Sequence, residues 1–298
     1  MWSNRAAINA VPPRASAATS PPRPGCTNDT CGASPYNPFL DALVTQGYAE
    51  DTFYPKTGAA LPDFSFSCMD NEYLTGLAAG ATGMLGLTKN QISLHKQAST
   101  KLKLADTFSL CLPASGAGKL AIGIKPKSVK STQLIVNPVS TYPIHTEGDA
   151  SDEYFIEVKA IAVARAVHNS IYKPLTRAFA KAASDMRIKS AAAVAPFRAC
   201  FRSDSIARMA AGPAVPEIEL VLGGKDTTTW RMRGANVRVE IDRETTCLGF
   251  VDGGSSPRTA VVIGAHQLEK NLLEFDLVSS RLRFSENLLL MNTTCSKI

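Results

Sequence analysis

The chain of 298 residues is 45% hydrophobic and 19% charged, a composition that supports a buried core rather than a disordered chain. Its 20 glycines and 18 prolines are ordinary numbers for this length and exclude collagen-like and low-complexity classes. Lys and Arg outnumber Asp and Glu by 32 to 26, but they are dispersed along the chain, so we expect no nucleic-acid partner. Since no apolar run reaches about 18 residues, we expect no membrane partner either.

The first half begins with residues 1–25, whose Pro, Ala, Ser and Arg content predicts a disordered leader without the apolar core of a signal peptide. Short strands separated by turns follow, and a short helix is expected around Gln91–Gln97. Thr107–Leu112 and Lys119–Gly123 predict two strands joined by a turn that contains Pro and Gly. The Pro- and Lys-containing stretch 125–143 is interpreted as the linker that ends this half.

The second half repeats the pattern of short strands around one longer helix. Tyr154–Val158 predicts a strand, and Ile171–Ala183 predicts an amphipathic helix that holds Pro174 in its first turn. Two segments carry the same signature, an apolar strand that ends in Gly and is followed by a short helix and a hairpin: Gly83–Leu87 and Ala260–Gly264. A unit used twice predicts a mostly β protein with two related lobes.

Seven cysteines and four histidines are scattered along the chain. Their spacing matches no zinc motif, so we expect neither a metal site nor a cofactor. Widely separated cysteines in a β protein are typical of a disulfide framework formed in an oxidising compartment. Two Asn-x-Thr sequons, at Asn28 and Asn292, predict glycosylation and agree with such a compartment.

Several short strings with a characteristic order extend along residues 26–298. They are Phe66–Cys68, Phe108–Pro113, Ala195–Phe201, Val215–Leu220, Trp230–Asn236, Thr246–Phe250 and Val262–Ser285. Together they resemble the TAXI-type xylanase inhibitors of plants and their relatives, the legume basic globulins and the nepenthesin-like aspartic proteinases. The resemblance implies a mostly β, bilobal pepsin-like fold, with an incomplete N-terminal lobe over 26–135 and a C-terminal lobe over 145–298.

Six of the seven cysteines can be paired by this resemblance together with the cysteine count. A Cys200–Cys247 bridge resembles the one that the pepsin fold carries in its C-terminal lobe. A Cys26–Cys31 bridge would close a local loop, and a Cys111–Cys295 bridge would tie the tail back to the first lobe. Cys68 is then left unpaired, which is the expected consequence of losing the first strands and their cysteines. Each bridge would contribute roughly 2–4 kcal/mol.

The catalytic motif of aspartic proteases is absent from the sequence. These enzymes need two carboxylates that share one proton, each presented by an Asp-Thr-Gly or Asp-Ser-Gly turn. The chain contains neither turn: its Asp-Thr pairs begin at Asp29, Asp51, Asp106 and Asp226, and none is followed by Gly. The sequence therefore predicts no catalytic residue and no proteolysis.

By resemblance, we expect a non-catalytic inhibitor that binds a microbial endo-1,4-β-xylanase or another glycoside hydrolase through loops of its C-terminal lobe. In the TAXI-type inhibitors a histidine of the C-terminal tail enters the cleft of the enzyme, and Met291 occupies that position here. A second contact loop, Phe201–Arg208, offers Ile206 as an apolar tip and Arg202 and Arg208 as cations. The family also implies a monomer in the extracellular space or cell wall that acts in plant defence.

Two alternatives stay open. Family relatives are aspartic endopeptidases, and an upstream exon with a signal peptide and an Asp-Thr-Gly turn would restore that activity. An inactive truncated relative is the other alternative, because the Pro-rich leader occupies the place of the first active-site strand. Since Met291 cannot donate a charged hydrogen bond to a carboxylate, the expectation for direct xylanase binding is that it is weak.

Overall fold

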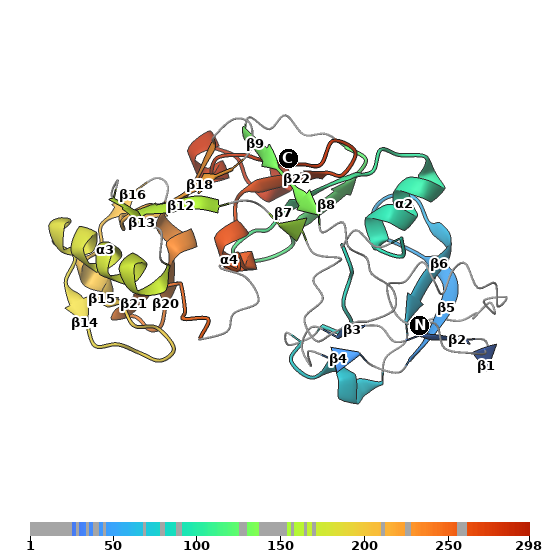
Figure 1. Ribbon diagram of the computed structural model, residues 1–298, viewed down its shortest axis with the longest axis horizontal. Helices are drawn as coiled ribbons and strands as arrows, with labels where there is room; N and C mark the ends of the chain where they lie inside the picture. The colour runs from blue at the N-terminus through green and yellow to red at the C-terminus, as the bar shows by residue number, and fades with distance from the viewer. Residues whose placement is uncertain are drawn as a thin grey trace. The chain divides into compact units, whose positions relative to one another are not determined.

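The computed structural model describes residues 26–27, 30–33, 36–37, 42–43, 46–67, 70–77, 81–87, 91–124, 130–136, 154–155, 158–163, 166–168, 171–209, 212–223, 228–254 and 261–298. Within these ranges short strands form seven sheets and helices are few (Figure 1). The mostly β fold class expected from the sequence is therefore confirmed. The predicted leader lies outside the described residues, as do Asn28 and Cys68.

The chain divides into two compact units. The first consists of Met1–Thr107 and Ile135–Phe155, and the second of Phe108–Leu134 and Ile156–Ile298. The chain thus enters the second unit, returns to the first and then completes the second. The lobe boundaries that the resemblance implied stay a prediction.

A four-stranded sheet organises the first unit. The elements of this unit are β1 (Cys26–Thr27), β2 (Thr30–Ala33), β3 (Tyr36–Asn37), β4 (Ala42–Leu43), β5 (Gln46–Phe53), β6 (Leu61–Ser67), η1 (Asn71–Leu74), α2 (Leu94–Leu102), β10 (Ile135–Val136) and β11 (Tyr154–Phe155). The sheet has the order β1-β2-β5-β6, with Ala49 and Phe64 buried. Helix α2 is fixed to β6 because the Gln97 side chain accepts from the Ser65 N–H at 2.8 Å and donates to its carbonyl at 2.9 Å.

A five-stranded sheet of the second unit joins two hairpins that are far apart in the sequence. Its strands are β7 (Thr107–Cys111), β8 (Lys119–Ile122), β9 (Lys130–Gln133), β22 (Leu272–Asp276) and β23 (Arg281–Phe284), in the order β8-β7-β22-β23-β9. One face is aromatic, since the rings of Phe108 and Phe275 stack at 4.6 Å and those of Trp230 and Phe284 at 5.3 Å. Side chains alternate along a strand, so Leu272 and Glu274 lie on the opposite face.

The rest of the second unit contains two four-stranded sheets, β13-β12-β18-β19 and β14-β15-β21-β20, and the hairpin β16–β17. Its elements are β12 (Val158–Val163), β13 (Ala166–His168), α3 (Tyr172–Asp185), β14 (Ser190–Ala191), β15 (Cys200–Arg202), η2 (Ser203–Ser205), β16 (Arg208–Met209), β17 (Gly212–Pro213), β18 (Ile218–Leu222), β19 (Thr228–Met232), η3 (Gly234–Val237), β20 (Arg238–Glu240), β21 (Thr245–Leu248), α4 (Ala265–Leu268), η4 (Leu288–Met291) and η5 (Cys295–Lys297). The predicted helix is confirmed as α3, which buries Phe179 against Phe201 with ring centroids 5.8 Å apart.

The two predicted strands that end in Gly are wrong. Residues 83–87 and 261–264 form neither strand nor helix, and Leu85 and Val262 are 52% and 79% exposed. Apolar and β-branched residues favour an extended chain, but a strand also needs a ladder of hydrogen bonds to a neighbouring strand, and the described residues of these segments belong to none of the sheets. The elements that follow them are as predicted: α2 precedes the β7–β8 hairpin, and α4 precedes the β22–β23 hairpin.

The interpretation of 125–143 as a linker is also wrong in its middle. Strand β9 lies within this stretch and pairs antiparallel with β23, with Ser131 opposite Arg283. The sequence of β9, Lys-Ser-Thr-Gln, carries no apolar alternation, so nothing local marked it as a strand. The helix expected around Gln91–Gln97 begins later, at Leu94, and continues to Leu102.

Candidate functional site

The predicted contact loop 201–208 starts from a rigid strand end. Cys200 and Cys247 stand opposite each other in the β15–β21 pair and form a disulfide with their Cα atoms 3.9 Å apart. Just beyond it, the Ser203 N–H donates to the Glu244 carbonyl at 2.8 Å, and the Ser203 hydroxyl lies 2.8 Å from the Thr246 hydroxyl. The loop is therefore anchored to the sheet by a disulfide and by hydrogen bonds at the point where it leaves β15.

Arg202, one of the two predicted cations of this loop, is paired within the loop itself. Its Nε donates to Asp204 Oδ1 at 3.1 Å and its Nη2 to Oδ2 at 2.5 Å. This side-chain hydrogen bonding raises the pKa of Arg202 and lowers the pKa of Asp204. The positive charge of Arg202 is thus already compensated before any partner arrives.

The free charge and the exposed apolar surface of the loop lie further along, in the β16–β17 hairpin. Arg208 is exposed and forms no ion pair with another residue that the structure describes. Ile206, the predicted apolar tip, is half-buried, whereas Met209 is 67% exposed. Sequence reasoning missed Met209. The signal in the sequence was Gly212, because glycine favours a tight turn. In the structure Gly212 has a φ of +106° and pairs with Met209 in the hairpin.

The C-terminal tail is anchored by a second disulfide and by buried amides. Cys111 of β7 and Cys295 of η5 form a disulfide with their Cα atoms 5.4 Å apart. Asn287 donates from Nδ2 to Asn236 Oδ1 at 3.0 Å, and its own Oδ1 accepts the Leu289 N–H at 3.0 Å. Two of the three disulfide pairings suggested by the resemblance and the cysteine count are therefore present, and both anchor a predicted contact segment.

The apolar run of the tail divides between the core and the surface. Leu288 is 2% exposed and packs with Cys111, Leu272 and Cys295, while Leu290 and Met291 are 44% and 52% exposed. Asn292 follows in the left-handed region with φ +50° and is exposed, so its sequon is accessible; its glycosylation stays a prediction. The third pairing concerns Cys26 and Cys31, which are register partners in β1–β2 but whose side chains lie outside the described part.

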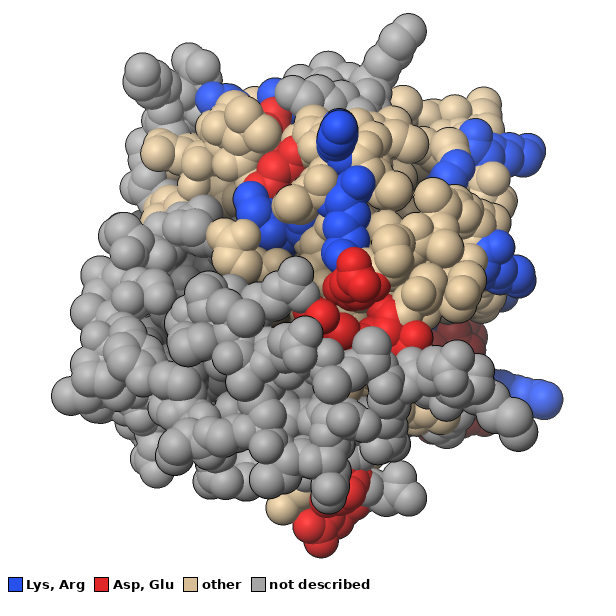
Figure 2. Space-filling model, turned by 90° about the vertical axis from the view of Figure 1, so that its right-hand side faces the viewer, with Lys and Arg blue, Asp and Glu red and all other residues tan. Residues whose placement is uncertain are grey.

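The structure does not bring the two contact segments into one cluster. In Figure 1 the hairpin strand β16 and the C-terminus lie apart within the second unit. On the face shown in Figure 2, several Lys and Arg side chains of described residues stand singly among uncharged residues, and a group of Asp and Glu side chains lies near the middle of the view. Arg208 and Met209 on one side, and Leu290 and Met291 on the other, are therefore two separate candidate contacts.

Two buried carboxylates lie together on β22, but their geometry is that of an ion-pair cluster. Arg283 Nη1 lies 2.7 Å from Glu274 Oε1, and its Nη2 lies 3.0 Å from Asp276 Oδ2. Both carboxylates come from the same strand and are compensated by one guanidinium, which differs from two carboxylates that share a proton across two lobes. Within the described ranges, no three His, Cys, Asp or Glu side chains group to hold a metal ion, and no helix has the length and hydropathy needed to cross a membrane.

Comparison with known proteins identifies the fold family. The family described as "Xylanase inhibitor N-terminal" matches residues 3–124, and "Xylanase inhibitor C-terminal" matches residues 158–286. The probable aspartic proteinase GIP2 of Nicotiana benthamiana is 37% identical over 327 residues, covering 93% of this chain and 74% of that protein. This alignment is longer than the whole chain of 298 residues, so the relative carries internal residues that this chain lacks.

Solved structures agree with the family match. The crystal structure of edgp superposes with a TM-score of 0.83 at 34% identity, covering 98% of this chain and 85% of that one. The crystal structure of basic 7S globulin from soybean superposes with a TM-score of 0.80 at 25% identity, covering 99% and 86%. The chain therefore belongs to the TAXi family, described as xylanase inhibitors, and has its pepsin-like fold.

Proposed function

We propose that this protein is a non-catalytic member of its family that binds a glycoside hydrolase of the microbial endo-1,4-β-xylanase type. The proposal rests on a contrast between the catalytic motifs, which the sequence lacks, and the predicted contact segments, which are anchored and exposed. The sequence lacks both Asp turns of an aspartic protease, whereas both predicted contact segments stand next to a disulfide and expose side chains to solvent. The sequence thus has contact loops anchored by disulfides, and it lacks the two Asp turns that proteolysis needs.

The β16–β17 hairpin is the primary contact in this proposal. A glycoside hydrolase cleft carries two carboxylates that flank the scissile bond, about 5–9.5 Å apart depending on mechanism. Arg208 offers a guanidinium that can bind a carboxylate through two parallel hydrogen bonds, and Met209 offers an adaptable apolar contact beside it. Because Arg208 and Met209 are paired with Pro213 and Gly212 in the β16–β17 hairpin, we expect binding to cost little backbone conformational entropy. Met291 on the tail is the second, weaker contact.

The binding proposal is tested by isothermal titration of the protein into a purified microbial xylanase with an acidic cleft. We expect Arg208→Ala to weaken binding by about tenfold or more, because it leaves a cleft carboxylate unpaired. The matched control is Arg177→Ala, an exposed arginine on α3 of the same unit, which should bind like the wild type. Equal affinity of the two variants, or no binding by the wild type, would overturn the proposal.

A second candidate function is aspartic endopeptidase activity, and the name of the GIP2 relative favours it. The missing Asp turns oppose it, since a dyad needs two carboxylates within about 3 Å of each other. A casein-cleavage assay at acid pH, with and without pepstatin, separates the two candidates. Pepstatin-sensitive cleavage by the purified protein would establish the enzyme and end the non-catalytic proposal.

We further propose that the protein works outside the cell as a monomer, in defence against microbial hydrolases. The Cys111–Cys295 and Cys200–Cys247 bridges support an oxidising compartment, because structural disulfides persist there and are rare in the cytosol. Recovery of the protein from cell-wall extracts of its tissue, at a sedimentation coefficient of one chain, is the expected result. Recovery only from a cytosolic fraction with free thiols would contradict it.

A further inference from the structure

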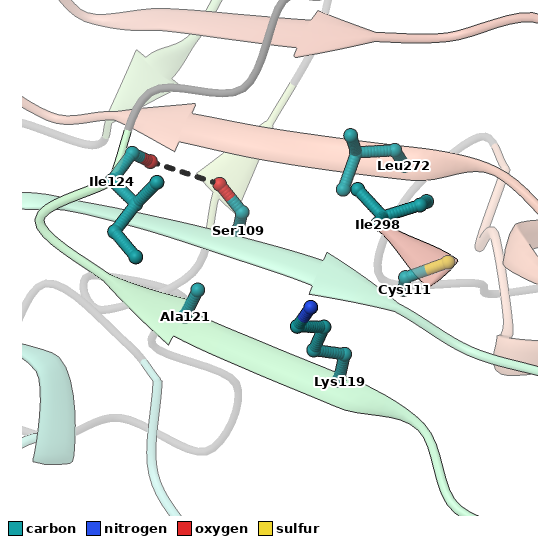
Figure 3. Close-up of a pocket in the computed structure, with 7 residues that line it drawn as sticks. All are labelled: Ser109, Cys111, Lys119, Ala121, Ile124, Leu272 and Ile298. Atoms are coloured by element: carbon teal, nitrogen blue, oxygen red, sulfur yellow. Dashed lines mark hydrogen bonds between the residues drawn. The ribbon is translucent and has the colours of Figure 1, made fainter. Parts of the chain in front are cut away.

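A small pocket lies on the face of the five-stranded sheet that is opposite the aromatic stacks. Figure 3 shows its walls, which come from β7, β8, the first residue of β22 and the side chain of Ile298. Its volume is about 200 Å³. The pocket lies within the second unit and includes neither the β16–β17 hairpin nor Met291, so it is separate from the proposed hydrolase contacts.

Small residues and a close hairpin create the space. Ser109 and Ala121 stand opposite each other in the β7–β8 pair, and neither side chain is large enough to fill the face of the sheet above them. Gly118 allows the hairpin to close tightly, because a Cβ at this position would lie 2.8 Å from the Cys111 carbonyl oxygen. The Cys111–Cys295 bridge holds η5 in place, and Ile298 therefore forms a fixed wall.

The pocket combines apolar walls with one cation. The Ser109 hydroxyl is already used, since it donates to the Ile124 carbonyl at 3.3 Å (Figure 3). The Lys119 side chain lies at one end with its ammonium group turned toward the pocket, and it forms no ion pair with another described residue. Ile124, at the rim, is 61% exposed although its side chain is fully apolar. An occupant that covers Ile124 and meets the Lys119 charge would satisfy both features.

We propose that this pocket binds a small monocarboxylate with an apolar body, either one aromatic ring with a short side chain or an aliphatic chain of about eight carbons. The size follows from the volume, because a protein cavity of about 150 Å³ accommodates benzene. The charge follows from Lys119, which pairs with the carboxylate at the end of the pocket, while Leu272, Ala121 and Ile298 enclose the apolar body. This inference is independent of whether the protein binds a glycoside hydrolase.

Octanoate is the probe for the test, titrated into the full chain and followed by calorimetry and saturation-transfer NMR. We expect octanoate to bind with a Kd below about 1 mM. Lys119→Gln removes the charge and leaves a polar side chain that is one atom shorter, and it should weaken octanoate binding about tenfold. The control Lys181→Gln changes a lysine on α3 that is 79% exposed, and it should leave binding unchanged. Octan-1-ol should bind less tightly than octanoate and should not respond to Lys119→Gln.

Substitutions that fill the pocket with a larger side chain provide the decisive test. Ala121→Phe should abolish octanoate binding, and Ile124→Trp, which starts from an exposed side chain, should do the same if Ala121→Phe fails to fold by circular dichroism. No octanoate binding to the wild type at about 10 mM, or unchanged binding by a folded pocket-filling variant, would overturn the proposal. Equal binding of octanoate and octan-1-ol, unaffected by Lys119→Gln, would overturn the assignment of a carboxylate ligand.

Discussion

Arg202 and Asp204 hold each other through two hydrogen bonds, of 3.1 Å and 2.5 Å, on the loop expected to contact a hydrolase. Their side chains are 57% and 64% exposed, and an ion pair so accessible to water adds little to stability. Its effect is on the charge that the loop presents. With Arg202 compensated, Arg208 is the cation that the loop offers to an acidic cleft.

The first prediction concerns this pair. Asp204→Asn keeps the size of the side chain but removes its charge, which frees Arg202, so we expect xylanase affinity to rise by about threefold to tenfold. Removal of both charges together, in the double variant Arg202→Ala/Asp204→Asn, should change the affinity by less than about twofold, because the pair carries no net charge. Surface plasmon resonance at low ionic strength measures both variants. Weakening by the double variant as large as that caused by Arg208→Ala would contradict this expectation.

The second prediction concerns the tail. Met291 is 52% exposed but carries no charge, so Met291→His should strengthen xylanase binding and make it dependent on pH. Affinity should rise as the pH falls from about 7 to about 5, because the introduced imidazole becomes protonated in that range. Val278→His, at a position that is 72% exposed on the β22–β23 turn, is the control and should add no such dependence. A flat pH profile for Met291→His would exclude the tail as a contact.

The third prediction tests what fixes the tail. Asn287→Ala removes the hydrogen bond to Asn236 and the acceptor for the Leu289 N–H, leaving buried groups unpaired. We expect a loss of about 2 kcal/mol in the free energy of unfolding, and a lower Tm. Hydrogen exchange should accelerate at residues 289–292 and stay unchanged in α3. Unchanged hydrogen exchange at residues 289–292 would contradict this prediction and would show that the Cys111–Cys295 bridge alone is sufficient to hold the tail in place.

The fourth prediction is a loss of stability in acid that originates in the first unit. His95 is fully buried, with Nδ1 3.2 Å from the Ser93 hydroxyl and Nε2 3.7 Å from Asp106 Oδ1. Burial lowers the pKa of His95 from 6.5 to about 4; Asp106 acts in the opposite direction and Lys96 in the same one. The unfolded chain therefore binds a proton more readily than the folded chain does.

The direction of this pH dependence follows from proton linkage, because a group that binds protons more readily in the unfolded chain lowers the stability of the fold as the pH falls. The contribution of neutral His95 is complete above pH 6.5 and is lost as the pH falls toward about 4, at up to about 1.4 kcal/mol per pH unit. Thermal unfolding between pH 7.5 and 4.5 measures this loss. His95→Gln, which cannot be protonated, should lose less stability over the same range. An identical acid loss in wild type and variant would assign the effect to other groups.

The elements that could be predicted from sequence are those whose signal is local. Helix α3 was marked by its apolar periodicity and by Pro174 in its first turn, and the β7–β8 and β22–β23 hairpins by strands on either side of a turn. The strand β9 was missed because its pairing with β23 connects residues about 150 positions apart, and its polar sequence has no strand pattern.

For the candidate contact residues too, the sequence predicted only what local residue patterns can show. Sequence position and resemblance pointed to Arg202, Ile206, Arg208 and Met291, but exposure and pairing depend on the folded chain. Arg202 is neutralised by a residue two positions away, and Ile206 is half-buried, while the neighbouring Met209 is exposed. None of these differences follows from residue type alone.

The most direct test of the central claim is to titrate the activity of a microbial endo-1,4-β-xylanase with the purified protein while monitoring both proteins for cleavage. The account predicts that xylanase activity falls to a plateau as the protein is added, that Arg208→Ala shifts the curve to higher concentration by about tenfold, and that no peptide bond is cut. Unchanged xylanase activity at saturating protein, together with pepstatin-sensitive cleavage of the xylanase, would contradict it.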